Sequence, residues 1–154
     1  MKENIPFKAS YQVHDLFSQV SFQAGDAQFV KDALQFAYGQ SDARIQGVQA
    51  LSGTGGLRVF GELLARDHAD IYVPNPTWGN HKAIFTNAGL KVHQYRYYDA
   101  NESALDFEGM IEDLKSVPSG SWVLLHACAH NPTGMDPSLE EWKQVSDLCL
   151  ERNL

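Results

Sequence analysis

The hydrophobic positions of this chain recur first at a helical spacing. Between residues 26 and 38 the apolar side chains fall on one side of a helix: Phe29, Val30, Ala33, Leu34 and Ala37. Gly39 follows directly, as is common at the end of a helix. The pattern therefore predicts an amphipathic helix over 26–38 that closes at this glycine.

From residue 48 onward, short apolar runs alternate with helical stripes. The runs predict strands at 48–51, 71–73, 91–97 and 122–127, the last apolar enough to be buried on both faces. The stripes predict helices at 57–66, 78–87, 107–115 and 139–150. Asp106 should cap the third of these helices, and Ser138 with Glu141 forms a capping box for the fourth. The prolines in 74–76 predict a loop.

This alternation predicts an α/β domain in which a mostly parallel sheet is flanked by crossover helices. The 154 residues are enough for one domain with a core. The chain stops at Leu154, after a helix and where another buried strand should begin, which would leave a sheet edge without its neighbour. We therefore expect the sequence to be an incomplete part of a domain.

Charge and composition exclude several classes of protein. The net charge of −7 argues against a nucleic-acid partner, because phosphate binding requires a positive surface. No apolar run approaches the ~20 residues that cross a bilayer, which argues against a membrane protein. The first residues carry Glu3 and no arginine, unlike a secretory or transit signal. Cys128 and Cys149 are too few for a disulfide scaffold and predict a reducing compartment.

A glycine-rich stretch, residues 52–56, lies between a predicted strand and a predicted helix. Glycines let the backbone approach a ligand closely, and the following helix directs its free N–H groups at this stretch, which suits a phosphate. The stretch fits neither common nucleotide pattern, since no lysine follows and Arg58 replaces the third glycine. An ordinary strand–helix turn capped by Ser52 or Thr54 explains the local pattern equally well.

Two further stretches place functional side chains near strand ends. In residues 76–81, Trp78 could stack on a planar cofactor with His81 one helical turn away, although a core tryptophan and a surface histidine would give the same pattern. In residues 126–134, Asn131 follows a strand at the position where open α/β sheets bind ligands, and the proline after it favours an extended backbone. A buried strand ending in a turn is the alternative.

The stretch 126–134 also contains His126, Cys128 and His130 in alternation, which raises the question of a metal site. On a strand these side chains would share one face, but their spacing is unlike that of common zinc sites and no fourth ligand is evident. We therefore expect no metal. The sequence also lacks the nucleophile elbow of serine hydrolases.

Taken together and in this order, the three stretches closely resemble the aspartate aminotransferases, pyridoxal-phosphate enzymes of fold type I. The resemblance covers residues 26–154 and includes blocks in register at 52–55, 76–81, 95–99 and 126–134, continued by Asp136-Pro137 and Glu141-Trp142. It implies that 26–154 are a partial large domain that binds the cofactor, preceded by an unmatched segment at 1–25.

The resemblance implies roles for individual residues. Ser52, Gly53 and Thr54 would hold the phosphate of pyridoxal 5′-phosphate (PLP). Trp78 would pack beside the cofactor ring and line the substrate pocket. Asn131 would donate a hydrogen bond to the ring's phenolic oxygen and approach the substrate carboxylate.

His81 and His126 would support an aspartate that pairs with the pyridine nitrogen, so that the ring can act as an electron sink. That aspartate, the arginines that clamp the substrate and the Schiff-base lysine should all lie beyond Leu154. No lysine of this chain takes the place of the catalytic one, so no catalytic residue is assigned. We expect the chain alone to be inactive.

The implied activity is transfer of the amino group from L-aspartate to 2-oxoglutarate, giving oxaloacetate and glutamate. The implied partners are small amino-acid and 2-oxo-acid substrates and a second copy of the parent enzyme, in the cytoplasm, the mitochondrion or a plastid. One alternative is a catalytically dead short chain that binds PLP or phosphate, or acts as an interaction module. Another is a nucleotide-binding domain with Asp70 as the ribose partner.

Overall fold

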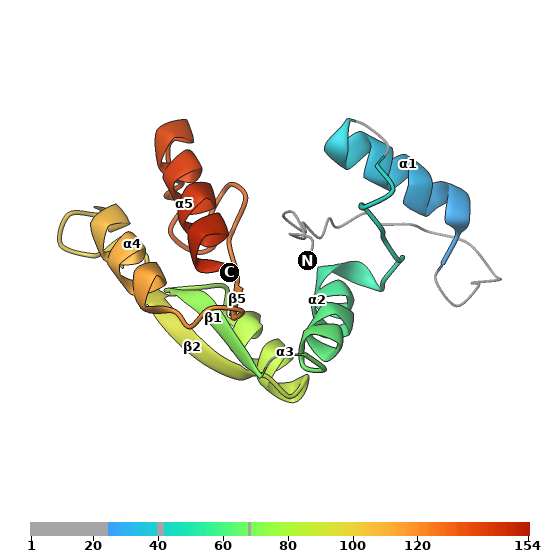
Figure 1. Ribbon diagram of the computed structural model, residues 1–154, viewed down its shortest axis with the longest axis horizontal. Coiled ribbons are helices and arrows are strands. Elements are labelled where there is room, and N and C mark those ends of the chain that lie inside the picture. The colour runs from blue at the N-terminus through green and yellow to red at the C-terminus, as the bar shows by residue number, and fades with distance from the viewer. Residues whose placement is uncertain (1–24, 40–41, 68) are drawn as a thin grey trace. The chain divides into compact units, whose positions relative to one another are not determined.

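The computed structural model describes residues 25–39, 42–67 and 69–154 and divides the chain into two units, 1–59 and 60–154. Most of the predicted N-terminal segment 1–25 lies outside the described residues. Figure 1 shows the elements of both units.

The first unit contains the predicted amphipathic helix, α1 (Ala27–Tyr38). The Asp26 carboxylate accepts a hydrogen bond from Phe29 N at 2.7 Å, and Gly39 ends the helix at a φ of 67°. The residues of the predicted stripe are the more buried ones, and Gly47 packs against them: a Cβ there would lie 3.3 Å from Leu34 Cδ2. The prediction for this helix is confirmed.

The next two predictions were wrong in their boundaries. Residues 48–51 form no strand, because a strand needs a neighbour for its hydrogen-bond ladder and the described part of this unit contains none. The helix α2 (Ser52–Leu64) begins five residues earlier than the predicted 57, so the glycine-rich stretch is its first turn. Glycine is tolerated there because the first turn depends least on helix propensity.

The second unit is built on a three-stranded parallel sheet, which confirms the predicted α/β class. β1 (Asp70–Asn75) lies at the centre, with β2 (Lys91–Arg96) on one side and β5 (Trp122–Val123) on the other. The chain crosses from β1 to β2 through α3 (Asn80–Asn87). It returns from β2 to β5 through α4.

The two crossovers run in opposite directions, so right-handed connections place α3 and α4 on opposite faces of the sheet. α4 (Phe107–Ser116) and α5 (Leu139–Arg152) lie side by side on one face (Figure 1). A short antiparallel pair, β3 (Tyr98–Asp99) and β4 (Ala104–Leu105), was not predicted.

The main core of this unit lies between the sheet and the α4–α5 pair. Its most buried members come from β2, α4 and α5 and the segments that follow them: Tyr95, Tyr97, Met110, Leu114, Val117, Val145 and Leu148. Ile71 and Val73 alternate with Tyr72 along β1 and therefore point to the opposite face. Both faces of the sheet are thus covered, as a parallel sheet requires.

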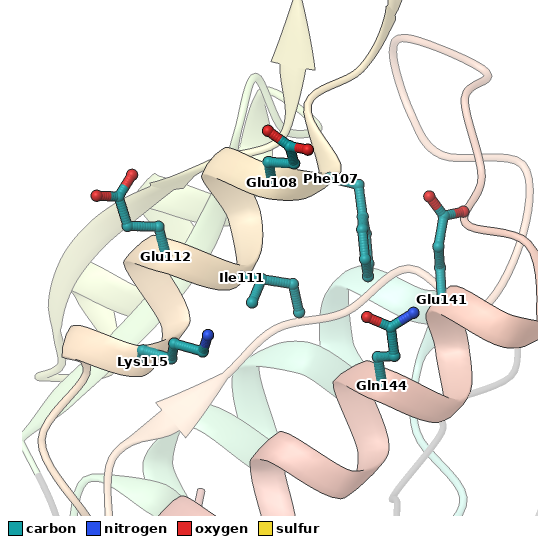
Figure 2. Close-up of a pocket in the computed structure, with 7 residues that line it drawn as sticks. All are labelled: Phe107, Glu108, Ile111, Glu112, Lys115, Glu141 and Gln144. Atoms are coloured by element: carbon teal, nitrogen blue, oxygen red, sulfur yellow. The ribbon is translucent and has the colours of Figure 1, made fainter.

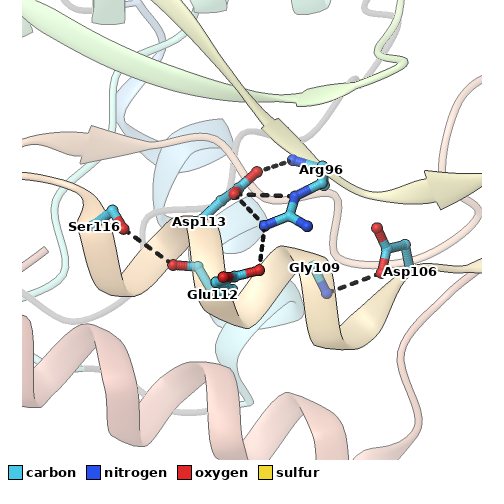
Figure 3. Close-up of polar contacts among 6 residues, drawn as sticks. All are labelled: Arg96, Asp106, Gly109, Glu112, Asp113 and Ser116. Carbon is cyan, nitrogen blue, oxygen red and sulfur yellow. Dashed lines mark hydrogen bonds and ion pairs between the residues drawn. The ribbon is translucent and has the colours of Figure 1, made fainter.

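An ion-pair network attaches α4 to the end of β2 (Figure 3). The Arg96 guanidinium lies 2.7 Å from Asp113 Oδ1 and 2.6 Å from Glu112 Oε2, and Arg96 N donates to Asp113 Oδ2 at 2.7 Å. These contacts raise the pKa of Arg96 and lower that of Asp113. Asp106 caps the helix as predicted, accepting from Gly109 N at 2.9 Å.

Several predicted boundaries moved. β5 covers only Trp122–Val123 of the predicted 122–127, and both residues are half-buried rather than buried, because β1 is their only partner strand in the described structure. β1 extends through Pro74 and Asn75, which were predicted as loop, and α3 starts at Asn80 rather than at Trp78. The capping box of Ser138 and Glu141 is confirmed at the start of α5.

Candidate active site

The site of the second unit lies at the carboxyl ends of β1 and β5, which are neighbours in the sheet. Thr77 and Trp78 follow β1, and His81 lies in the first turn of α3. His126 and the loop that carries Asn131 follow β5. The parallel pairing brings these segments together, so Trp78, His81, His126 and Asn131 occupy one end of the sheet.

A chain of hydrogen bonds links the two histidines through a threonine. Thr77 Oγ1 lies 2.8 Å from His81 Nδ1 and 3.4 Å from His126 Nε2. On its other side, His126 Nδ1 accepts a hydrogen bond from Asn131 N at 3.2 Å. The backbone N–H of Asn131 can only donate, so it determines the direction of the whole chain.

The tautomers follow from this direction. Since His126 Nδ1 accepts, the neutral ring carries its proton on Nε2 and donates to Thr77 Oγ1. The Thr77 hydroxyl can then donate to His81 Nδ1, which leaves the proton of His81 on Nε2. No described residue accepts from His81 Nε2, so this N–H is available to a ligand or another part of the protein.

The aromatic rings around these histidines form a continuous series of ring contacts, two of them stacked and two edge-on. Tyr97 stacks on His130 with ring centroids 3.9 Å apart, and His130 stacks on His126 at 4.3 Å. His81 meets His126 edge-on at 5.3 Å, and Trp78 meets His81 edge-on at 5.2 Å. These contacts fix the planes of the rings, so that the hydrogen-bonding atoms of the histidines have defined directions.

Burial favours the neutral form of the three histidines. It lowers the pKa of His81 and of His130 to about 4, and in both cases the charge of His126 adds to the effect. The pKa of His126 is also lowered by burial, against the opposing attraction of Asp136. Neutral rings agree with the tautomers assigned to His81 and His126, because a neutral imidazole can accept at one nitrogen and carries its proton on the other.

Asn131 has a fixed backbone and an available side chain. Its N–H is held by His126, and the preceding residue, His130, is almost fully buried at 1% exposure. The side-chain amide of Asn131 is exposed and has no hydrogen-bond partner among the described residues. An amide placed in this way can donate to a ligand oxygen without first breaking an internal bond.

Ser52, Gly53 and Thr54 belong to the first unit and form the first turn of α2. Helix geometry leaves the first backbone N–H groups without an intrahelical acceptor, and the helix dipole makes this end positive. The side chains of Ser52 and Thr54 are exposed. This turn therefore offers backbone and hydroxyl donors to an anion.

Sequence reasoning missed several residues of the second unit. Thr77 joins His81 to His126, and His130 lies between His126 and Tyr97. Thr133 Oγ1 lies 2.9 Å from His130 Nδ1. Thr77 lies four residues before His81, the one local signal that could have indicated a contact between them.

The expected alternation of His126, Cys128 and His130 on one strand face was wrong. Residues 126–130 form no strand, and Ala129 has a left-handed backbone with a φ of 51°. The chain turns there, so that His126 and His130 stack while Cys128 is exposed. In the described residues, no group of three or more His, Cys, Asp and Glu side chains could hold a metal ion.

A separate groove lies on the surface between α4 and α5 (Figure 2). It encloses about 520 Å³ and is lined by Phe107, Glu108, Ile111, Glu112, Lys115, Glu141 and Gln144. Glu112 pairs with Arg96, and Glu141 completes the capping box of α5. None of the predicted site residues lines it.

No helix in the described part of the chain is long and apolar enough to cross a membrane.

Known proteins match most of the chain. A family model described as aminotransferase class I and II matches residues 15–154. A cytoplasmic aspartate aminotransferase from Oryza sativa subsp. japonica is 53% identical over 137 residues, which cover 84% of this chain and 34% of the relative.

Solved structures give the same picture. A mitochondrial aspartate aminotransferase from Trypanosoma brucei has a TM-score of 0.84 at 39% identity, covering 92% of this chain and 39% of that one. An aromatic-amino-acid aminotransferase from Burkholderia pseudomallei, solved covalently bound to pyridoxal phosphate, has a TM-score of 0.84 at 34% identity, covering 90% of this chain and 37% of that one. The chain thus spans about a third of the length of these proteins.

Proposed function

The chain belongs to the class I and II aminotransferase family, and we propose that it is part of the cofactor-binding domain of an aspartate aminotransferase. The proposed reaction transfers the amino group of L-aspartate to 2-oxoglutarate, giving oxaloacetate and glutamate. The observation that carries the proposal is the directed chain Asn131–His126–Thr77–His81, which ends in an available N–H donor beside Trp78.

Each unit, taken by itself, offers groups that suit one part of PLP. The first turn of α2, with Ser52, Gly53 and Thr54, offers the N–H groups and hydroxyls that a phosphate requires. Trp78 offers an aromatic ring for a planar group, and Asn131 offers a free amide for a phenolic oxygen. When bound, the cofactor supplies an electron sink for the substrate carbon that carries the amino group.

The residues of this chain would bind and orient. Ser52, Gly53 and Thr54 would hold the phosphate through hydrogen bonds, and Trp78 would limit the tilt of the ring and line the substrate pocket. Asn131 would donate to the phenolic oxygen and to the substrate carboxylate. His81 would donate from Nε2 to a carboxylate that holds the pyridine nitrogen protonated, and His126 would keep His81 in the required tautomer through Thr77.

The identity of the substrate and the assembly are parts of the proposal. An aspartate aminotransferase and an aromatic-amino-acid aminotransferase share this fold equally well, so preference for aspartate rests on the 53% identity with the rice enzyme. We propose a homodimer that acts on small amino acids and 2-oxo acids. Its location would be the cytoplasm or the mitochondrion, as in the rice and trypanosome proteins, or a plastid.

The proposal assigns the Schiff-base lysine to a region outside residues 1–154. A polypeptide of only these residues should therefore show no transaminase activity, whether or not it retains weak affinity for PLP. The second candidate, a short chain that binds PLP or acts as an interaction module, would be supported if the native product were no larger than 17.2 kDa.

The experiment is PLP binding by the native full-length protein that carries this sequence, followed by its visible absorption. We expect a Ser52→Ala, Thr54→Val double variant to bind PLP roughly 10²- to 10⁴-fold more weakly, because it loses two hydrogen bonds to a charged group and each costs about 1.5–3 kcal/mol. Ser146→Ala is the matched control, since Ser146 is exposed on α5 and lies outside the site.

Unchanged PLP affinity in the double variant would contradict the proposed phosphate site. Asn131→Ala tests the ring contact separately, with Asn101→Ala as its control, since the Asn101 side chain is exposed. We expect only Asn131→Ala to change the pH at which the absorption of the bound cofactor titrates.

A further inference from the structure

One carboxylate holds the loop that carries Asn131. Asp136 accepts hydrogen bonds from two successive backbone N–H groups, from Ala129 N to Oδ2 at 2.6 Å and from His130 N to Oδ1 at 2.9 Å. Ala129 has a φ of 51°, a left-handed conformation that residues other than glycine rarely adopt. Because the two oxygens bind adjacent amides, Asp136 fixes the direction of the backbone as it enters Asn131.

A tyrosine closes the same loop from the side of the core. The Tyr97 hydroxyl donates to Met135 O at 2.6 Å, next to Asp136, while its ring stacks on His130. Gly134 N donates to His130 O at 2.7 Å and completes the turn. The loop is therefore held at both ends, before Asn131 and after Gly134.

Asn131 itself is left free to act. Its side-chain amide makes no hydrogen bond to the described residues, although its own N–H and that of His130 are both engaged. The loop thus restrains the backbone of Asn131 and leaves its side chain without a hydrogen bond to the described residues. Such an arrangement suits a group that must meet a ligand in one orientation.

We propose that Asp136 is a positioning residue: through the N–H groups of Ala129 and His130, its carboxylate sets the orientation in which the Asn131 amide meets cofactor and substrate. This inference rests on the proposed function, because Asn131 has such a role only in an aminotransferase. Asp136 acts entirely through the backbone. The proposal gives its side chain no direct contact with cofactor or substrate.

The test is Asp136→Asn in the full-length holoenzyme, read out by the pH titration of the bound cofactor's absorption. A donor to the phenolic oxygen favours the deprotonated form, so a misplaced Asn131 amide should raise the pH of the titration midpoint. We expect Asp136→Asn to shift the midpoint upward, in the same direction as Asn131→Ala and by a smaller amount. In the double variant the shift should equal that of Asn131→Ala alone.

The kinetics separate positioning from general damage to the fold. Asp136→Asn should raise the KM for the amino-acid substrate at least as much as it lowers kcat, because Asn131 also approaches the substrate carboxylate. Glu140→Gln is the matched control, an exposed carboxamide substitution at the start of α5. A lower melting temperature with an unchanged cofactor midpoint and KM would overturn the proposal.

A wild-type measurement keeps the proposal testable if Asp136→Asn does not fold. The amides of Ala129 and His130 should exchange slowly with solvent deuterium although Ala129 is exposed. Fast exchange of both would overturn the proposal. Failure of the wild-type protein to bind PLP would instead overturn the proposed function, and the exchange measurement would still test the Asp136 contacts.

Discussion

Lowering the pH from 7 to 5 should destabilise the native protein, because two histidines are buried as neutral rings. His81 is 6% exposed and faces Thr77, Trp78, Phe85 and His126. Burial is the main cause that lowers its pKa to about 4 from the usual 6.5.

His130 has the same depressed pKa of about 4 and is 1% exposed. It faces Tyr97, His126 and Thr133, and the carboxylate of Asp136 opposes the shift without cancelling it. Its Nε2 is buried without a hydrogen-bond partner among the described residues. Protonation at that atom would therefore leave a charge with no acceptor.

The sign and size follow from proton linkage. The unfolded chain binds protons at these histidines below about pH 6.5, whereas the folded chain does so only near pH 4, so stability falls as the pH drops through this interval. For one histidine the loss between pH 7 and pH 5 is about 2 kcal/mol. The two rings share His126 as a neighbour, so we expect roughly 2–4 kcal/mol for the pair.

The assay is urea-induced unfolding of the full-length protein at pH 7 and pH 5, followed by tryptophan fluorescence. His130→Phe keeps a ring in the stack but cannot titrate, so the loss between the two pH values should shrink by about half. His93→Gln is the control, because His93 pairs with Asp70 at 2.7 Å on the surface. Removing this surface histidine should not reduce the difference in stability between pH 7 and pH 5. Equal stability at pH 7 and pH 5 in the wild type would refute the reasoning.

Three further results are expected. Met110→Ala should lower the unfolding free energy by about 2–5 kcal/mol with an unchanged denaturant slope, because Met110 is 0% exposed in the core; Lys143→Ala on the surface should not. Ser138→Ala should lower the unfolding free energy by about 1 kcal/mol in the same assay, because it removes the cap of α5, and Ser146→Ala should lower it by less. Equal losses in the two variants would mean that the cap does not stabilise the helix. A thiol reagent should label the exposed Cys128 of the native protein well before Cys149, whose pKa is raised by burial; equal rates at the two cysteines would contradict the packing of α5.

Local periodicity and caps predicted the helices best. The stripe from Phe29 to Ala37 and the caps Asp106 and Ser138 are all found where the sequence indicates them, because each depends on residues within one or two turns. The strands were predicted less well. The apolar run that starts at Trp122 continues to residue 127, but only two residues pair with β1, and apolar character alone does not reveal how far pairing extends.

The predicted site residues of the second unit come together because the topology places the ends of β1 and β5 side by side. What the sequence could not reveal are the links between them. Thr77 and His126 are 49 residues apart. The left-handed turn that stacks His130 on His126 is formed by Ala129 rather than by a glycine, so the sequence does not indicate it. The sequence includes Asp136 in the family resemblance but does not predict its two backbone contacts, because these depend on the folded loop.

Formation of oxaloacetate by the purified full-length native protein, supplied with L-aspartate, 2-oxoglutarate and PLP, tests the central claim most directly. We expect a rate that depends on added PLP and that falls strongly in Asn131→Ala but not in Asn101→Ala. A PLP-saturated protein that is folded and far larger than 17.2 kDa, yet forms no oxaloacetate, would contradict it.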